Sequence, residues 1–266
     1  VVVLDTGSTD DTVARLEARG AAATVETIVP WRFDTARNRS LELVDQDADI
    51  CVCTDLDEVF HPGWRAALEA AWTPEAGQPG PMVTALGVQL DHHPDPAKSR
   101  GQYLPLLELS VREEPEDDRN AHYLGREYFF HGQWDDCIAT LQGHLSMPSA
   151  TWKDERAASM RYIAKSYLQK GDLTQAEGWF LRAAAEAPHL REPWMDLATL
   201  CYRREQWNGV LHFTGTALAI TVRPDTYICE AESWGPLPHA LRCQAYFRTG
   251  RIGPALEAAQ KALALS

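Results

Sequence analysis

The feature that most constrains the fold is a pattern that recurs in the second half of the chain. Three segments, REYFFHGQWDDCI, KSYLQKGDLTQAE and QAYFRTGRIGPAL, each place an aromatic residue four positions before a glycine and a small residue five positions after it. A fourth, degenerate copy in TLCYRREQWNGVL has no glycine at the turn. The matching positions are Tyr128/Gly132/Cys137, Tyr167/Gly171/Ala176 and Tyr246/Gly250/Ala255, with Tyr202 and Leu211 in the degenerate copy.

The copies follow one another at intervals of roughly 35–45 residues, and each one predicts a helix, a glycine turn and a second helix. Glycine permits the tight turn, and the small residue lets the paired helices approach closely. This period and pattern are typical of tetratricopeptide (TPR) repeats. Because such arrays present extended concave surfaces, the repeats predict a protein or peptide partner, or a second subunit in a homodimer.

Residues 1–72 follow a different pattern, in which strand and helix signals alternate. VVVL, TVETIV and ICVCT predict strands, whereas TVARLEARG and TARNRSLELV predict helices. Strands that alternate with helices indicate a parallel α/β sheet, with VTALGVQL as one more candidate strand. The expected fold is therefore α/β followed by all-α. The expected boundaries are an α/β domain at 1–90, a junction at 91–102 and a helical repeat domain at 103–266.

Composition narrows the class of protein further. A hydrophobic content of 45% is ordinary for a globular chain, and the formal net charge of −13 disfavours a nucleic-acid or anionic-membrane partner. The apolar runs are too short for a membrane span, and Asp5 interrupts the one near the N-terminus, so no signal peptide is expected. The six cysteines form no CxxC pair and are interpreted as reduced core thiols of a cytoplasmic protein. Since the chain opens in mid-strand without an initiator Met, we expect a fragment.

Three motifs in the first part occur in a recognisable order: VVVLDTGSTDDT, then WRFDTARNRSL, then CTDLDEV. Together they resemble the nucleotide-sugar half of family-2 glycosyltransferases of the GT-A fold. HHPDPAKSRGQYLPLLE, YLGREYFFHGQW, LREPWMDLA and SWGPLPHAL resemble the junction and TPR region fused to one branch of that family. The resemblance implies a truncated, metal-dependent glycosyltransferase. It would transfer a sugar from a nucleotide-diphosphosugar, such as a UDP-sugar, to an acceptor that includes protein or peptide.

The resemblance also assigns donor-binding residues. Asp5 would contact the base or ribose, because a carboxylate accepts hydrogen bonds from a ring N–H or a ribose hydroxyl. Arg37 would face the nucleotide, since its planar fork suits phosphate or base edges, although a solvated surface cation is the alternative. The turn after Asp5 also predicts a cap for the first helix, with Thr9 or Asp10 as N-cap. The implied donor set is Asp5, Thr6, Gly7, Ser8, Asp10, Arg37, Asn38 and Asp55.

A metal site is expected at the acidic motif. Asp55 and Asp57 point to the same face if the strand continues, and their repulsion is relieved by a cation between them. Mn²⁺ or Mg²⁺ fits, because hard cations prefer oxygen ligands. The resemblance gives the metal mainly to Asp57, with Asp55 nearer the ribose and with His92 or His93 completing the site. The alternatives are an acidic turn before a helix N-terminus and two loop histidines at a junction.

The general base of an inverting transfer is not identified in the sequence. Between Trp64 and Asp91 the glutamates are Glu69, in a predicted helix, and Glu75, in a predicted loop, and neither is nominated. Two other functions therefore stay open. One is a non-catalytic TPR protein-binding scaffold that carries a remnant glycosyltransferase domain. The other is a different α/β enzyme, such as a nucleotidyltransferase, which also uses paired aspartates and a metal.

Overall fold

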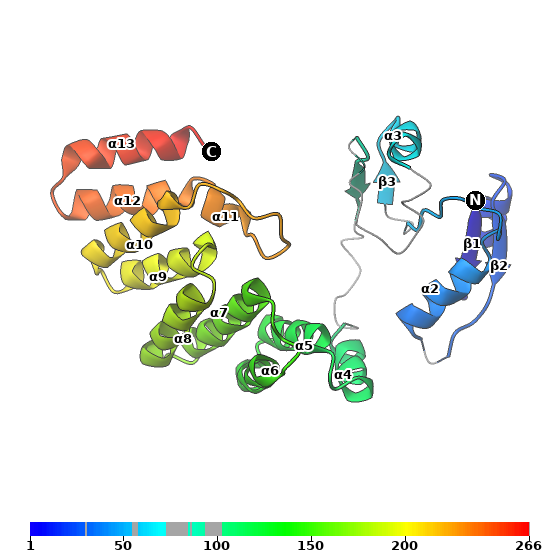
Figure 1. The fold of residues 1–266 in the computed structure, drawn as a ribbon, viewed down its shortest axis with the longest axis horizontal. Helices are drawn as coiled ribbons and strands as arrows, with labels where there is room; N and C mark the ends of the chain where they lie inside the picture. The colour runs from blue at the N-terminus through cyan, green and yellow to red at the C-terminus, as the bar shows by residue number, and fades with distance from the viewer. Residues whose placement is uncertain (30, 55–57, 73–84, 86, 94–102, 266) are drawn as a thin grey trace. The chain divides into compact units, whose positions relative to one another are not determined.

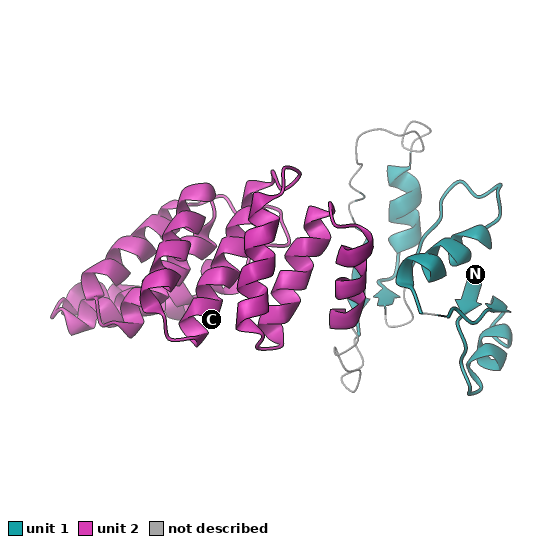
Figure 2. Ribbon diagram, turned by 90° about the horizontal axis from the view of Figure 1, so that it is seen from below, with its two compact units in different colours: residues 1–98 teal, residues 99–266 magenta. Residues whose placement is uncertain are grey.

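The computed structural model describes residues 1–29, 31–54, 58–72, 85, 87–93 and 103–265. The chain divides into two compact units, Val1–Lys98 and Ser99–Ser266 (Figure 2). Within the described ranges, all strands belong to the first unit, and the second unit is helical. None of the helices in these ranges is both long and apolar enough to cross a lipid bilayer.

The second unit is a row of helical hairpins, each packed on the next in chain order (Figure 1). Helix α4 (Tyr103–Glu113) packs on the first hairpin, and the short α11 (Ala231–Trp234) precedes the last one. This arrangement confirms the helical repeats predicted from the sequence. The hairpins are α5 (Asp118–Phe130) with α6 (Trp134–Ser146), α7 (Lys153–Gln169) with α8 (Leu173–Glu186), α9 (Arg191–Arg203) with α10 (Trp207–Ala219), and α12 (Leu237–Arg248) with α13 (Ile252–Leu263).

The predicted turn glycines occupy the backbone conformation that requires them. Gly132, Gly171 and Gly250 have φ of 73°, 81° and 75°, in the left-handed region that disfavours a side chain. After the first of these turns, the N–H of Gln133 donates to the carbonyl of Tyr128 at 2.9 Å. This bond satisfies a carbonyl at the helix end, as in a Schellman motif.

The degenerate copy uses the same turn with a glutamate at the left-handed position. Glu205 has φ of 56°, and the N–H of Gln206 donates to the carbonyl of Cys201 at 2.9 Å. The structural equivalents are therefore Cys201 and Val210, so the predicted alignment on Tyr202 and Leu211 is wrong by one residue. Val210 is fully buried and occupies the position of the small interhelical residue in the other copies. Aligning this copy on its aromatic residue, Tyr202, did not reveal this register.

The core of the array lies between the helices of successive hairpins. Its largest fully buried side chains include Leu141, Ile163 and Phe180. Close approach is enforced at Gly125, where an added Cβ would lie 2.3 Å from Cδ2 of Leu141 on α6. The small residues predicted to face the paired helix are buried as expected: Cys137, Ala176 and Ala255.

The first unit contains two separate two-stranded sheets. Strands β1 (Val2–Asp5) and β2 (Ala22–Val25) pair in parallel, with α1 (Thr12–Glu17) between them in sequence and α2 (Phe33–Glu42) against β1. This pair matches the first part of the predicted α/β pattern. The second sheet pairs β3 (Glu58–Phe60) with β4 (Leu90–His92) in antiparallel register, and α3 (Trp64–Ala71) follows β3.

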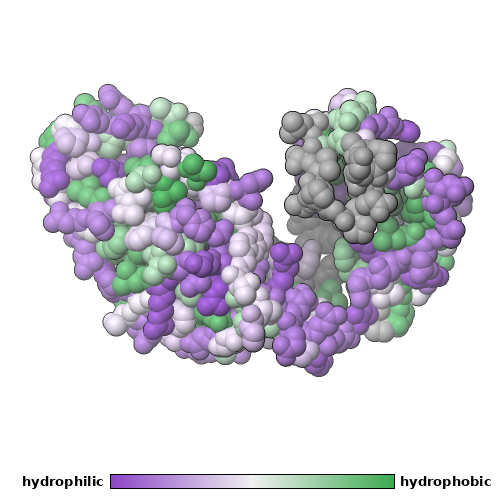
Figure 3. All heavy atoms as spheres, viewed as in Figure 1, coloured by the Kyte–Doolittle hydropathy of each residue, from purple (hydrophilic) through white to green (hydrophobic). Residues whose placement is uncertain are grey.

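The prediction of a third parallel strand at ICVCT is wrong, because residues 51–54 are not in a strand. Strands of three or four residues in two-stranded sheets bury little surface, and Val2, Val25 and Val59 remain 44%, 57% and 55% exposed. Figure 3 shows hydrophobic residues at the surface of this unit. Among its described residues, no hydrophobic side chain is buried, and the predicted parallel sheet is limited to the pair β1–β2.

The cysteine prediction is confirmed only in part. Cys137 and Cys201 are buried thiols of the helical core, and burial raises the pKa of Cys137 to about 11. Cys51 and Cys53 are exposed instead, with their Sγ atoms 3.9 Å apart. Their position in an apolar segment predicted that Cys51 and Cys53 are buried. No helix or strand of the described residues covers residues 51–54, so the two thiols are exposed.

Candidate functional site

The predicted donor site begins at Asp5, the last residue of β1. Its Oδ1 accepts the backbone N–H groups of Gly7 at 3.0 Å and Ser8 at 2.9 Å. Hydrogen bonds from Ser8 and Gly7 lower the pKa of the carboxyl group, so it stays ionised. Asp5 is the one buried residue of this unit within the described ranges, and it holds the turn at the end of the strand.

The turn and the second helix carry the other predicted donor residues. Asp10 accepts the backbone N–H of Thr12 at 3.0 Å, so it closes the turn before α1, whereas the N-cap of α1 is Asp11. The cap prediction is thus wrong by one residue. Arg37 and Asn38 lie on α2, which contacts β1, and the Arg37 guanidinium lies 4.9 Å from the centre of the Phe33 ring.

The predicted metal ligands are only partly within the described ranges. Asp55 and Asp57 lie outside them, and so does Glu75. His92 ends β4, opposite Glu58, and His93 follows it; both imidazoles are exposed. The described residues do not bring a third metal-ligating side chain to these histidines.

The array carries a more developed site, which we call the α7–α9 pocket. It is a cavity of about 190 Å³ with an apolar floor and a polar rim. Sequence reasoning did not single it out, because its residues come from four helices, α5, α7, α8 and α9, which belong to three hairpins. The residues that line it are Phe129, Lys165, Leu168, Gln169, Phe180, Asp196, Thr199, Leu200 and Arg203.

A second hollow of about 100 Å³, which we call the loop pocket, lies where the segment 221–230 returns to α5 and α7. Tyr227 and Ile228 of this segment form one wall. His122 lies at its base, and burial lowers the pKa of His122 to about 4, so this imidazole is neutral at neutral pH. The complete lining is His122, Arg126, Ala158, Arg161, Tyr162, Tyr227, Ile228 and Glu230.

Arg161 lies between the two pockets and fixes their walls. Its Nε donates to Asp196 on α9 at 2.5 Å, and its Nη2 donates to Glu230 at 2.8 Å. Burial lowers the pKa of Arg161, but the carboxylates of Asp196 and Glu230 raise it by more, so the guanidinium is permanently charged. Lys165 lies near the same two carboxylates, so Arg161 and Lys165 together neutralise Asp196 and Glu230 within the protein.

Two arginines that line these pockets have fewer polar partners than Arg161. Arg203 on the rim of the α7–α9 pocket is exposed and forms no ion pair with any residue in the described ranges. The Nε of Arg126 in the loop pocket is buried, with no hydrogen-bond partner among them.

Comparison with solved structures gives the fold of the array. The APC/C hetero-tetramer Cut9–Hcn1 matches with a TM-score of 0.50 and 13% identity, over 62% of this chain and 30% of that chain. The second unit is a TPR-like helical array. MamA matches with a TM-score of 0.48 and 14% identity, over 60% of this chain and 84% of that chain. The C-terminal part of a TPR repeat-containing protein from Cytophaga hutchinsonii matches with a TM-score of 0.49 and 14% identity, over 62% of this chain and 59% of that chain.

Neither of the two sequence comparisons finds a relative. No protein-family model matches the chain, and no curated protein matches it. The solved structures are all below 25% identity, so their likeness concerns the fold and carries no activity to this chain.

Proposed function

We propose that the helical array is a protein-binding scaffold that holds an acidic peptide segment of its partner in the α7–α9 pocket. The observation that carries this proposal is a cavity with both apolar and polar lining residues, among them Arg203, a cation without an ion-pair partner among the described residues. Phe129, Leu168 and Leu200 offer apolar contact inside the cavity. Helical repeats use such surfaces for extended partners.

The charges of the pocket determine the chemistry of the peptide. Asp196 is bound by Arg161, so it does not neutralise the rim as a free carboxylate would. Lys165 lies 3.6 Å from Glu230 and 4.0 Å from Asp196, a loose pairing that leaves its ammonium partly available. A guanidinium binds a carboxylate bidentately, so Arg203 favours Asp, Glu or a C-terminal carboxylate beside an apolar side chain.

The test is selection of peptides followed by measurement of affinity. We expect random displayed peptides selected on the full chain to carry an acidic residue next to an apolar one. Arg203→Glu should weaken binding of the selected peptides by about tenfold or more, because the new carboxylate at the rim repels the acidic residue of the peptide. Fluorescence anisotropy with labelled peptides measures this change, and added salt should weaken binding to the unmodified chain.

Arg182→Glu is the matched control, since it makes the same charge change on α8. Arg182 is exposed and stacks on Trp179, with its guanidinium 4.5 Å from the ring centre. This variant should bind the selected peptides normally. Peptides without acidic residues, or equal losses in the two variants, would contradict the proposed pocket.

A second candidate function concerns the first unit, and it rests on the sequence resemblance together with one structural observation. We propose that this unit binds the nucleoside diphosphate of a sugar donor, as a metal-dependent glycosyltransferase does. The supporting observation is the parallel pair β1–β2, with an ionised Asp5 at the carboxyl end of β1 and α2 against the same strand. Ligands bind at such ends in parallel α/β sheets.

Mn²⁺ or Mg²⁺ would be held in this unit by Asp57, Asp55 and a histidine. Of these residues the structure describes His92 and His93, exposed imidazoles whose chemistry fits Mn²⁺. We expect calorimetry with UDP and Mn²⁺ to give binding heat that is lost in Asp57→Ala. Asp47→Ala, at an exposed turn, is the control and should retain it. Absence of heat in the unmodified chain would refute donor binding and leave the peptide proposal standing.

A further inference from the structure

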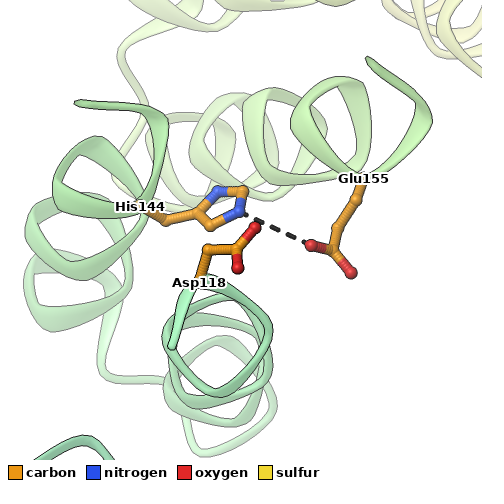
Figure 4. Close-up of side chains that lie close together, drawn as sticks. All are labelled: Asp118, His144 and Glu155. Atoms are coloured by element: carbon orange, nitrogen blue, oxygen red, sulfur yellow. Dashed lines mark ion pairs between the residues drawn. The ribbon is translucent and has the colours of Figure 1, made fainter. Parts of the chain in front are cut away.

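Three helix ends of the first two hairpins bring ligand atoms together. Asp118 is in the first turn of α5, His144 is in the last turn of α6, and Glu155 is in the first turn of α7. Figure 4 shows their side chains converging on one point, and one ligand atom from each lies within 4.8 Å of the others. Acidic residues in the first turn of a helix and a histidine in the last turn are also favoured by the helix dipole. The residue types alone therefore do not establish a metal site.

The second observation is the state of the His144 ring. The residue is 1% exposed, and its Nδ1 lies 3.0 Å from Oγ of Ser159. Its Nε2 is buried without a hydrogen-bond partner among the described residues, and it points toward the two carboxylates (Figure 4). The distance of 3.6 Å from Nε2 to Oε1 of Glu155 is too long for a direct hydrogen bond. A buried polar atom left in this state is costly unless something occupies the space between these groups.

The surrounding hydrogen bonds hold both groups in place. Oγ of Ser159 also lies 2.7 Å from Nδ1 of His122, which completes a chain from α5 through α7 to α6. The hydroxyl of Tyr227 donates to Oε2 of Glu155 at 2.6 Å. Nε2 of His144 and Oε1 of Glu155 are therefore the atoms left to face the centre. Ligating histidines and carboxylates in metal sites are supported in this way through their other polar atoms.

We propose that Asp118, His144 and Glu155 bind one divalent transition-metal ion, for which Zn²⁺ is the probe. An imidazole with two carboxylates suits Zn²⁺ better than Mg²⁺ or Ca²⁺, and three protein ligands leave a position for water. Buried Glu155 and half-buried Asp118 would otherwise place two carboxylates near one imidazole. Asp118 can make the small movement that coordination at about 2 Å requires. The ion would join α5, α6 and α7, and so fasten the first two hairpins together.

The experiment uses the full chain in a Cys51→Ser/Cys53→Ser background, because those exposed thiols also bind Zn²⁺. After chelator treatment, we expect competition with a chromophoric chelator to show that His144→Gln and Asp118→Asn each bind one Zn²⁺ fewer than the background, or bind that ion at least about tenfold more weakly. Zn²⁺ should also raise the midpoint of thermal unfolding, since the site exists only in the folded array. Co²⁺ should give visible absorption without the charge-transfer band of a thiolate ligand.

Asp118→Asn keeps the proposal testable if His144→Gln disturbs folding, because Asp118 is only half-buried at a helix end. His212→Gln, at an exposed position on α10, is the matched control and should bind Zn²⁺ as the background does. Equal Zn²⁺ binding by the background and both ligand variants would overturn the site. Absence of stoichiometric binding would overturn it too, and would indicate that a proton on His144 pairs with Glu155 instead.

Discussion

Arg161→Met should lower the free energy of unfolding of the array by about 3–5 kcal/mol, because it leaves two carboxylates without their buried partner. Arg161 is 3% exposed and joins Asp196 on α9 to Glu230 in the segment 221–230. Burial raises the pKa of Glu230, but Arg161 and Lys165 lower it by more, so Glu230 stays charged. A urea titration followed by far-ultraviolet circular dichroism, which reports the helices, measures the loss.

A triple variant separates the unpaired charges from lost packing. Arg161→Met combined with Asp196→Asn and Glu230→Gln should recover part of the stability, since both carboxylates are then neutral and only the partly exposed ammonium of Lys165 keeps its charge. Lys170→Ala is the surface control: Lys170 pairs with Asp135 at exposed positions, and its loss should leave the midpoint unchanged. If Arg161→Met lowered the free energy of unfolding no more than Lys170→Ala does, the ion pairs of Arg161 with Asp196 and Glu230 would not stabilise the array.

Phe180→Ala should lower the free energy of unfolding by about 3–5 kcal/mol, the usual cost of a cavity in place of a buried aromatic ring. Phe180 on α8 is 1% exposed and packs with Ala164 of α7 and with Leu197 and Leu200 of α9. It therefore joins the second hairpin to the third. Denaturant titration measures the loss, and hydrogen exchange should show faster opening of α7–α10 than of α12 and α13, because repeats are stabilised by their nearest neighbours.

Phe247→Ala is the matched control for this prediction. Phe247 on α12 is 61% exposed, so its removal takes away little buried surface and should hardly change the unfolding midpoint. A comparable loss in the two variants would mean that the array is not held together by the buried ring. Exchange that accelerates equally in every hairpin would argue against stabilisation between neighbours.

The two parts of the chain differ in how well the sequence predicts their structure. In the array, each turn glycine and each small interhelical residue is tied to a local requirement, a left-handed φ or a close approach, so the pattern predicts the hairpins directly. The exception was the degenerate copy, where Glu205 adopts the strained conformation and no glycine marks the register. In the first unit, a run of apolar and β-prone residues predicted a third parallel strand at 50–54, but strand pairing depends on distant partners that a local pattern does not specify.

The candidate sites also differ in whether the sequence alone identified them. Asp5 was identified from its position after a buried strand, and the structure places it at the end of β1 with its carboxylate holding the following turn. The α7–α9 pocket was not identified, because Phe129, Lys165 and Arg203 come from three helices. Each lies within a repeat segment, but none occupies a position that defines the repeat pattern. The cluster of Asp118, His144 and Glu155 was missed for the same reason, since each residue by itself is an ordinary choice for a helix end.

The sequence by itself therefore determined that the second part of the chain forms helical hairpins and where three of the four turns fall, because those properties depend on residues a few positions apart. Only the tertiary structure decided which side chains meet between hairpins, how Arg161 joins Asp196 to Glu230, and that Arg203 lies at the α7–α9 pocket. It also decided that the ends of α5, α6 and α7 converge on His144. The physical reason is that contacts between helices depend on how each hairpin packs on the next, which no short stretch of sequence encodes.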